Sequence, residues 1–189
     1  MSRRYRRRPP RSILALIFIL LLVGLRIWQH VSDQSQAPTQ IEAQREGTYQ
    51  VVRVVDGDTL IVKHDHRSAD RASAGEARVR LLSIDAPESV KPNHPIEPWG
   101  IAATEFTKSF VAGRQVTMRF DKRRQDRFGR WLAYIYVDDR MLNEELVRNG
   151  LAKAKVYYGD SQTVGRKLQR AEQDAKKAGR GIWSDFPGK

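Results

Sequence analysis

The chain has 189 residues, a formal net charge of +12 and no cysteine. This length allows one domain of ordinary size and an additional tail, and the lack of cysteine excludes a disulfide framework and any thiolate metal site. Seven arginines and no acidic residue lie within residues 1–30. The remaining chain is therefore moderately basic, which suits a polyanionic partner but can also serve solubility alone.

The N-terminal part predicts membrane targeting. Residues 1–11 are basic, and the apolar stretch over residues 12–28 contains an uninterrupted core, residues 13–25, of signal-peptide length. The small residues Ser35 and Ala37 lie far from this core, so a cleavage site is poorly supported. The pattern favours an uncleaved signal anchor over a cleaved signal. The arginines stay inside, so the domain is expected on the extracytoplasmic side, or secreted if the signal is cleaved.

The rest of the chain reads as a linker over residues 29–47 and one folded domain over residues 48–186. Alternating β-branched and aromatic residues predict five strands, over residues 49–55, 59–63, 77–84, 115–120 and 131–137. Helices are predicted over residues 99–112 and 141–148. A long third helix has one apolar face, formed by Val164, Leu168, Ala171, Ala175, Ala178 and Ile182. The fold class is α+β, a small five-stranded barrel with three helices, although strand count alone does not choose among barrel types.

The stretch VVDGDTL, residues 54–60, allows two interpretations. Asp-Gly between β-branched residues is a strong hairpin signal. The same residues place the carboxylates of Asp56 and Asp58 close enough to form half of a metal site. The heptapeptide alone leaves both open.

Three acidic residues follow predicted strands and could meet at one rim of a barrel: Asp58 after the first turn, and Asp85 and Glu88 after the third strand. Carboxylate oxygens are the ligands that Ca²⁺ and Mg²⁺ prefer, and the absence of histidine and cysteine from this set argues against zinc. His64 and His66, at the edge of a polar loop, are interpreted as solvent-exposed.

Two arginines complete the set. Arg80 lies at the end of the third strand and Arg130 directly precedes the fifth. A guanidinium binds phosphate oxygens bidentately and stabilises charge that develops in a transition state, so acids, a cation and arginines together suit phosphodiester hydrolysis. Each residue also has a structural interpretation, since Arg80 could simply pair with Asp85 and D-R-F-G-R could be a plain loop.

Seven segments occur in order along the chain: VVDGDT, VRLLSIDAPE, WGIAATEFT, FDK, DRFGRWLAYIY, LNEELVRNGLAK and GIWS. This series resembles the staphylococcal-nuclease-like (thermonuclease) family over about residues 48–186. The resemblance implies an OB-fold barrel with three helices and a Ca²⁺-dependent nuclease. The implied substrates are DNA and RNA, with single-stranded or locally unpaired chains preferred, cleaved at the P–O5′ bond to leave 3′-phosphate ends.

The resemblance also implies roles for individual residues. Asp58 and Asp85 would bind Ca²⁺ together with the carbonyl of Ala86, and Asp56 and Thr59 would support them. Arg80 and Arg130 would hold the scissile phosphate, and Glu88 would act as general base or organise the water molecules around the metal. The residues expected to contact substrate are Arg127, Phe128, Tyr157 and Tyr158.

Two positions depart from the family pattern, and a third is open. Phe128 stands where the family has a phosphate-contacting tyrosine, and Ala86 stands where it has a threonine after the second metal-binding aspartate. The base-stacking tyrosine falls in A-K-V-Y-Y, where Tyr157, Tyr158 or neither could serve. A different class of function remains open: a membrane-anchored OB-fold module that binds nucleic acid or protein without catalysis. The retained carboxylates and arginines favour the enzyme, which is expected to be monomeric.

Overall fold

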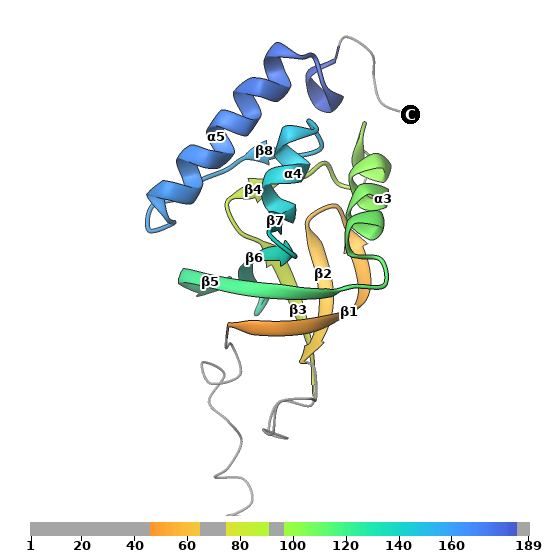
Figure 1. The fold of residues 1–189 in the computed structure, drawn as a ribbon, viewed down its shortest axis with the longest axis vertical. Helices are drawn as coiled ribbons and strands as arrows, with labels where there is room; N and C mark the ends of the chain where they lie inside the picture. Colours follow the sequence, from red (N-terminus) through yellow and green to blue (C-terminus); the bar gives the residue numbers. More distant parts are fainter. Residues whose placement is uncertain (1–45, 65–74, 91–96, 185–189) are drawn as a thin grey trace, which may run out of the picture. The chain divides into compact units, whose positions relative to one another are not determined.

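The computed structural model describes residues 46–64, 75–90 and 97–184 (Figure 1). The predicted basic segment and signal anchor lie outside these ranges, as do His66 and the predicted linker up to residue 45, while the first strand already begins at Gly47. Within them, no helix is both long enough and apolar enough to span a bilayer.

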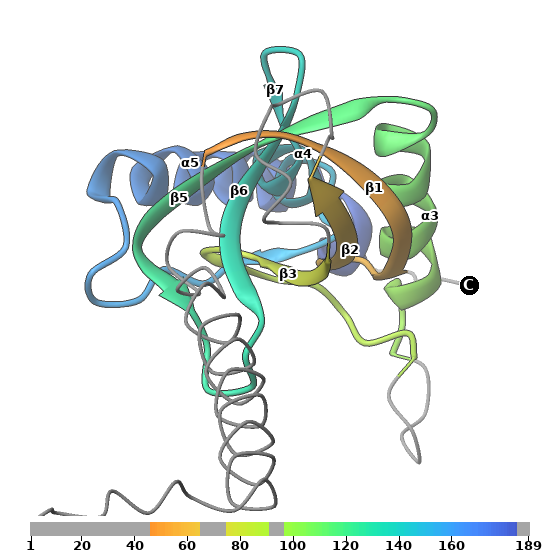
Figure 2. The same cartoon turned by 90° about the horizontal axis from the view of Figure 1, so that it is seen from below.

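Five strands close into a barrel. Hydrogen bonds connect the sheet in the order β3-β2-β1-β5-β6-β7, and an additional pairing between β3 and β6 closes the ring, which is visible from below in Figure 2. The predicted five-stranded barrel is confirmed, and its connectivity is consistent with an OB-fold. The barrel strands are β1 (Gly47–Asp56), β2 (Thr59–His64), β3 (Glu76–Leu81), β5 (Gln115–Gln125) and β6 (Trp131–Val137).

The strands form where alternate apolar side chains can point into a common core. Leu60 and Val62 from β2, Val79 from β3 and Met118 from β5 are completely buried. The third strand is shorter than the predicted 77–84, because Ser83 adopts a left-handed backbone conformation (φ 62°) that interrupts it. The chain resumes as the two-residue strand β4 (Ile84–Asp85), which pairs with β8 (Lys153–Ala154) in a separate small sheet.

Three helices cover the barrel, as predicted: α3 (Gly100–Val111), α4 (Leu142–Arg148), which follows the short strand β7 (Arg140–Met141), and α5 (Gln162–Lys177). Helix α5 buries Leu168, Ala171 and Ala175, and the Ser161 side chain accepts a hydrogen bond at its N-terminus.

The predicted length of the last helix was wrong. Helix α5 ends at Lys177, and a separate 3₁₀ turn, η2 (Gly181–Trp183), contains Ile182. Gly179 and Gly181 have positive φ values of 58° and 53°. Left-handed glycines of this kind end an α-helix. The apolar spacing that predicted one helix as far as Ile182 therefore extends past the end of α5 into η2.

Candidate active site

The strand pairing places the predicted site residues at one rim of the barrel. Arg80 of β3 lies opposite Thr59 of β2 and beside Leu132 of β6, in a parallel pairing. The β1–β2 turn therefore lies next to Arg80, and Arg130, which directly precedes β6, lies on the other side of Arg80. Residues far apart in the sequence meet because β3 pairs with β2 and β6 together.

The turn itself is a tight two-residue connection, because Asp56 pairs with Thr59 across it. Gly57 does not have a positive φ, so its role is not the conformational freedom that usually explains an Asp-Gly turn. A Cβ added at Gly57 would lie 2.7 Å from Cβ of Ala103 and 3.0 Å from Cβ of Ala86. Glycine is required here so that α3 and the Asp85–Glu88 segment can pack against the turn.

Arg80 contacts two of the predicted metal ligands at once. Its guanidinium forms an ion pair with the carboxylate of Asp58, and its Nη2 donates to Oδ1 of Asp85 at 2.7 Å. The amide of Ala86 donates to Oδ2 of Asp58 at 2.8 Å. The observed contact of Ala86 with the site is therefore through its N–H, whereas the family resemblance implied a role for its carbonyl.

Asp56 and Thr59 contact Asp58 rather than Asp85. Oδ1 of Asp56 accepts a hydrogen bond from the Asp58 amide at 3.1 Å, and Oγ1 of Thr59 donates to Oδ1 of Asp58 at 3.3 Å. Burial raises the pKa of Asp56, and a hydrogen bond from Thr59 and the charge of Arg80 partly offset that effect. Both residues therefore lie beside Asp58, and the supporting role that the family resemblance implied for them stays a prediction.

Glu88 lines the same small cavity, of about 140 Å³, together with Asp56, Asp58, Asp85 and the two arginines. Its Oε1 accepts hydrogen bonds from the backbone amides of Ser89 and Val90, both at 3.1 Å. The carboxylate is thus fixed by the backbone of its own loop.

Arg130 is oriented by a neighbour that the sequence did not single out. Oδ2 of Asp126 accepts from Nε of Arg130 at 2.7 Å, while Oδ1 of Asp126 accepts from the backbone amides of Phe128 and Arg130 at 2.8 and 3.0 Å. The same loop is closed by a bond from the Gly129 amide to the Asp126 carbonyl. Burial alone would raise the pKa of Asp126, but the hydrogen bonds from Arg130 and Phe128 lower it overall.

The two guanidinium groups influence each other. Burial lowers the pKa of Arg80, the charge of Asp85 opposes that effect, and the nearby charge of Arg130 lowers the pKa further. Two cations that repel each other across one cavity bind an anion there favourably, since the anion relieves their repulsion.

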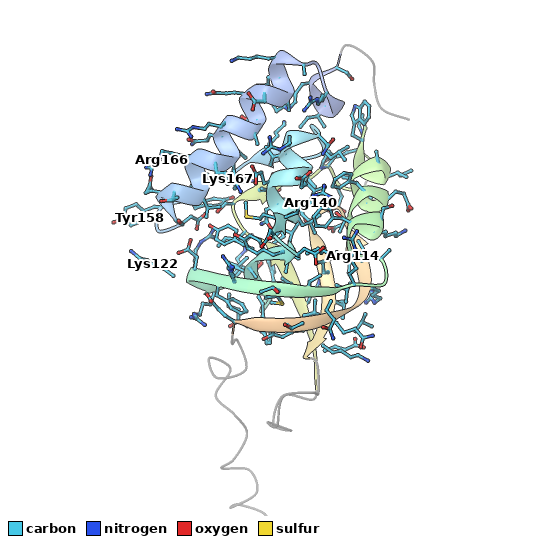
Figure 3. All side chains as sticks on the ribbon, viewed as in Figure 1. Arg114, Lys122, Arg140, Tyr158, Arg166 and Lys167 are labelled. Atoms are coloured by element: carbon cyan, nitrogen blue, oxygen red, sulfur yellow. The ribbon has the colours of Figure 1, made fainter. Side chains whose placement is uncertain are left out.

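A larger cavity of about 620 Å³ adjoins the small one through Arg80 and Arg130. Of the four predicted substrate-binding residues, Arg127, Phe128 and Tyr157 line it. Arg123 lies over the ring of Tyr157, 4.7 Å from its centroid. Tyr158 is fully exposed and Figure 3 shows it at the outer edge of the view, so the structure places Tyr157, not Tyr158, at this cavity.

Sequence reasoning missed two further charged residues. Nζ of Lys155 forms an ion pair with Oδ2 of Asp85 at 2.8 Å, and this hydrogen bond and charge raise the pKa of Lys155. Buried Asp160 accepts from Ser83 at 2.8 Å and from Arg123 and the Tyr157 amide at 3.0 Å. Asp160 therefore fixes the backbone of Tyr157. Among Asp126, Lys155 and Asp160, only Asp126 has a usable sequence signal, namely its position four residues before Arg130 in a loop that contains glycine.

The chemistry of the cavity fits a hard divalent cation. In the part of the chain that the structure describes, no three His, Asp or Glu side chains are grouped closely enough to form a metal site. Nevertheless, oxygens of Asp58 and Asp85 converge on one cation, the Arg80 guanidinium. Ca²⁺ takes carboxylate oxygens as ligands. The cavity offers those of Asp58 and Asp85, and two more acids, Asp56 and Glu88, also line it.

The fold and site define a small closed barrel whose rim combines clustered carboxylates with two arginines. Residues 78–185 match the family model described as "Staphylococcal nuclease homologue". The chain is 39% identical to a thermonuclease of Staphylococcus hyicus over 74% of this chain and 78% of that protein, and 34% identical to a thermonuclease of Staphylococcus intermedius over 89% and 95%. It is also 35% identical to endonuclease YncB of Bacillus subtilis (strain 168), over 70% of this chain and 59% of that protein. The chain belongs to the staphylococcal nuclease homologue family.

Proposed function

We propose that the chain is a Ca²⁺-dependent nuclease that hydrolyses the P–O5′ bonds of DNA and RNA and leaves 3′-phosphate ends. The observation that carries this proposal is the small cavity in which four acidic side chains and two arginines meet at the barrel rim. The relatives named thermonuclease and endonuclease support the same reaction class. We also propose that the enzyme acts as a monomer and prefers single-stranded or locally unpaired substrate.

Asp58 and Asp85 would hold the Ca²⁺ ion, with Ala86 beside them. When bound, the ion supplies Lewis-acid stabilisation of negative charge on the phosphate. Arg80 contacts the same two carboxylates, so its guanidinium would pair less with them when they hold the ion and would then be available to phosphate oxygens. Asp56 and Thr59 keep the Asp58 carboxylate oriented through the contacts described above.

Arg80 and Arg130 would bind the scissile phosphate from two sides. Their fork-shaped guanidinium groups can each pair with two phosphate oxygens, and this interaction strengthens as charge accumulates in the transition state. Glu88 would accept the proton of the attacking water, and the two amides on its Oε1 hold it in place for that role. Arg127, Phe128 and Tyr157 would contact the adjoining nucleotide in the larger cavity.

The test is digestion of a single-stranded DNA oligonucleotide and an RNA oligonucleotide by the full chain, with Ca²⁺ and with chelator. We expect cleavage with Ca²⁺ only, and product 3′ ends that become substrates for ligation or extension only after phosphatase treatment. Binding of the oligonucleotides without cleavage under any divalent ion would support the alternative, a non-catalytic OB-fold binding module, and overturn the nuclease.

We further propose that residues 12–28 anchor the protein in a membrane with the barrel on the extracytoplasmic side, or are cleaved to release it. This proposal depends on the run of arginines before an apolar stretch. In cells that express the anchored chain, the barrel should be found in the membrane fraction. Protease added to the intact cells should digest it. Protection of the barrel in intact cells, with digestion only after lysis, would contradict this location.

A further inference from the structure

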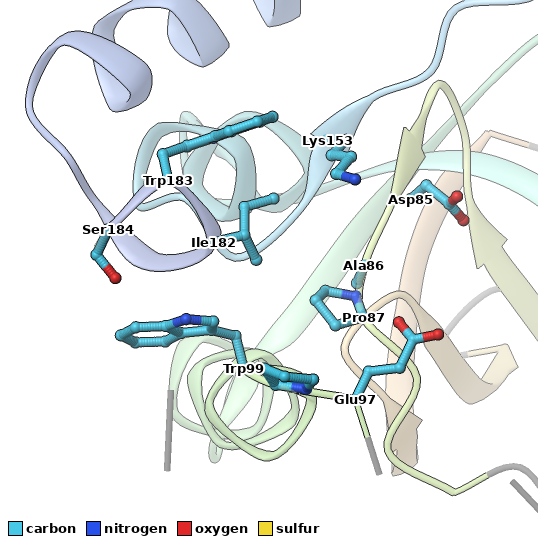
Figure 4. A pocket seen from close by; sticks show the side chains of 10 residues that line it. Asp85, Ala86, Pro87, Glu97, Trp99, Lys153, Ile182, Trp183 and Ser184 are labelled. Carbon is cyan, nitrogen blue, oxygen red and sulfur yellow. The ribbon is translucent and has the colours of Figure 1, made fainter. Parts of the chain in front are cut away.

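A second cavity borders the carboxylate cluster and shares no lining residue with the larger cavity that contains Tyr157. It has a volume of about 440 Å³ and shares its Asp85–Pro87 wall with the small cavity. Figure 4 shows the indole rings of Trp99 and Trp183 on opposite walls, with Ile182 between them. We call this cavity the tryptophan cleft. Its aromatic walls are not used by the proposed reaction.

Trp99 is held in the cleft by a strained backbone. It precedes the first residue of α3 with φ 70°, a left-handed conformation that bulky residues rarely adopt. The next residue, Gly100, approaches the Pro87–Glu88 backbone so closely that an added Cβ would lie 2.6 Å from the carbonyl oxygen of Glu88. Strain of this kind persists where surrounding packing enforces it, and it concentrates at ligand-binding positions.

Trp183 is positioned by a different part of the fold. The backbones of Gly150 and Gly181 meet with no room for a side chain on either residue, and the amide of Ile182 donates to the Gly150 carbonyl at 2.8 Å. Nζ of Lys176 lies 4.4 Å from the centroid of the Trp183 ring. The two indoles therefore come from independently anchored elements, which makes the cleft a preformed feature.

The location of the cleft suggests what it binds. The small cavity adjoins the larger Tyr157 cavity through Arg80 and Arg130, and adjoins the tryptophan cleft through Asp85–Pro87. A nucleic-acid strand with one phosphate at the two arginines thus has a cavity available for a nucleotide on each side. Lys153, which also lines the cleft, places a positive charge where the strand continues.

We propose that the tryptophan cleft binds the base of the nucleotide on the far side of the scissile phosphate from Tyr157, by stacking against Trp99, with Ile182 and Trp183 forming the opposite wall. This inference rests on the proposed nuclease function. Stacking on aromatic side chains tolerates all bases because every base has a π-face. The cleft therefore improves binding of a nucleic-acid strand without selecting its sequence.

The first test removes the base instead of the tryptophan. Oligonucleotides that carry one abasic position next to a single cleavable phosphate, on either side in turn, are compared with the intact oligonucleotide. For one of the two positions we expect kcat/KM of the unaltered chain to fall about tenfold, the lower part of the range for loss of one stacked base. In Trp99→Leu the same abasic substitution should have almost no further effect, whereas Trp99→Phe should keep most of the tenfold difference.

The second test needs no catalysis. With chelator present, oligonucleotides that contain 5-iodouracil at the same position are irradiated with the full chain, and the cross-linked peptide is identified by mass spectrometry. Cross-links at Trp99 or Trp183 support the proposal even if the chain cleaves nothing, so failure of the nuclease function is recognised separately. Equal abasic effects in the unaltered chain and Trp99→Leu, or cross-links confined to other peptides, would overturn the proposal.

Discussion

The two arginines of the site are supported in opposite ways. Arg80 lies in the barrel wall between β2 and β6, is largely buried, and pairs with Asp58 and Asp85 from two other segments. Arg130 lies at the end of a hairpin loop and pairs with Asp126, four residues before it in the same loop. The barrel thus fixes one phosphate-binding arginine through its tertiary structure, and a local carboxylate fixes the other.

The largest expected effects come from removing each arginine, and the two variants should differ in stability but not in activity. Arg80→Ala and Arg130→Ala should each lower the cleavage rate by about 100- to 1,000-fold, because each removes transition-state charge stabilisation. Arg80→Ala also leaves the buried Asp58 carboxylate without its partner, which should cost about 3 kcal/mol of unfolding free energy or more. Arg130→Ala should cost less, about 1 kcal/mol, since Asp126 still accepts hydrogen bonds from the Phe128 and Arg130 backbone amides. Urea unfolding measures the difference, and equal losses of stability would contradict the comparison.

Calcium affinity should separate them as well. Arg80 contacts the two carboxylates that we assign to the ion, so Arg80→Ala should bind Ca²⁺ about fivefold more tightly, or better, while cleaving far more slowly. Arg130→Ala should bind Ca²⁺ as the unaltered chain does, because Arg130 pairs with Asp126 instead. Isothermal titration of each folded variant with Ca²⁺ measures this. Weaker binding by Arg80→Ala would show that Arg80 and the ion do not compete.

A smaller effect is expected from the residue that orients Arg130. Asp126→Asn removes the charge that pairs with Arg130 but leaves an oxygen that can still accept from the Phe128 and Arg130 amides. We expect a loss in kcat of about tenfold with little change in KM, because the loop stays closed and the guanidinium loses its orientation. Asp138→Asn, which alters an exposed surface carboxylate, is the matched control and should leave kcat unchanged.

The smallest expected effect is a pH dependence from the same carboxylate. The pKa of Asp126 is lowered in the folded chain from its ordinary value of 3.8, so ionised Asp126 stabilises the fold above that pH. This contribution should be lost as the pH falls through the lowered folded pKa. The difference in unfolding free energy between the unaltered chain and Asp126→Asn should therefore shrink between pH 5 and about pH 2. A difference that stays constant over that range would show that Asp126 is not ionically paired.

The sequence was sufficient to predict the parts of the fold that depend on local patterns. Alternation of apolar residues predicted the five barrel strands, and the chain position of Asp58, Asp85 and Glu88 at strand ends predicted their meeting at one rim. The identity of Gly57 as a packing glycine was not predictable, because it depends on contacts with α3 and Ala86 that form only in the folded chain.

Other features escaped prediction because they depend on backbone conformation or distant partners. The left-handed backbone at Ser83 ends β3, and nothing in the apolar pattern of residues 77–84 signals it. The choice between Tyr157 and Tyr158 depends on Asp160, whose buried carboxylate accepts from the Tyr157 amide. The tryptophan cleft likewise joins Trp99 and Trp183 from segments that have no recognisable relation in the sequence.

Asp58→Asn is the variant that best tests whether the carboxylates and arginines at the barrel rim form the nuclease site. The full chain and this variant are compared for cleavage of one single-stranded DNA oligonucleotide in saturating Ca²⁺, with folding checked by circular dichroism. We expect that the unaltered chain cleaves and that Asp58→Asn, although folded, is slower by about 1,000-fold or more. Cleavage by the folded variant at a rate close to that of the unaltered chain would contradict it.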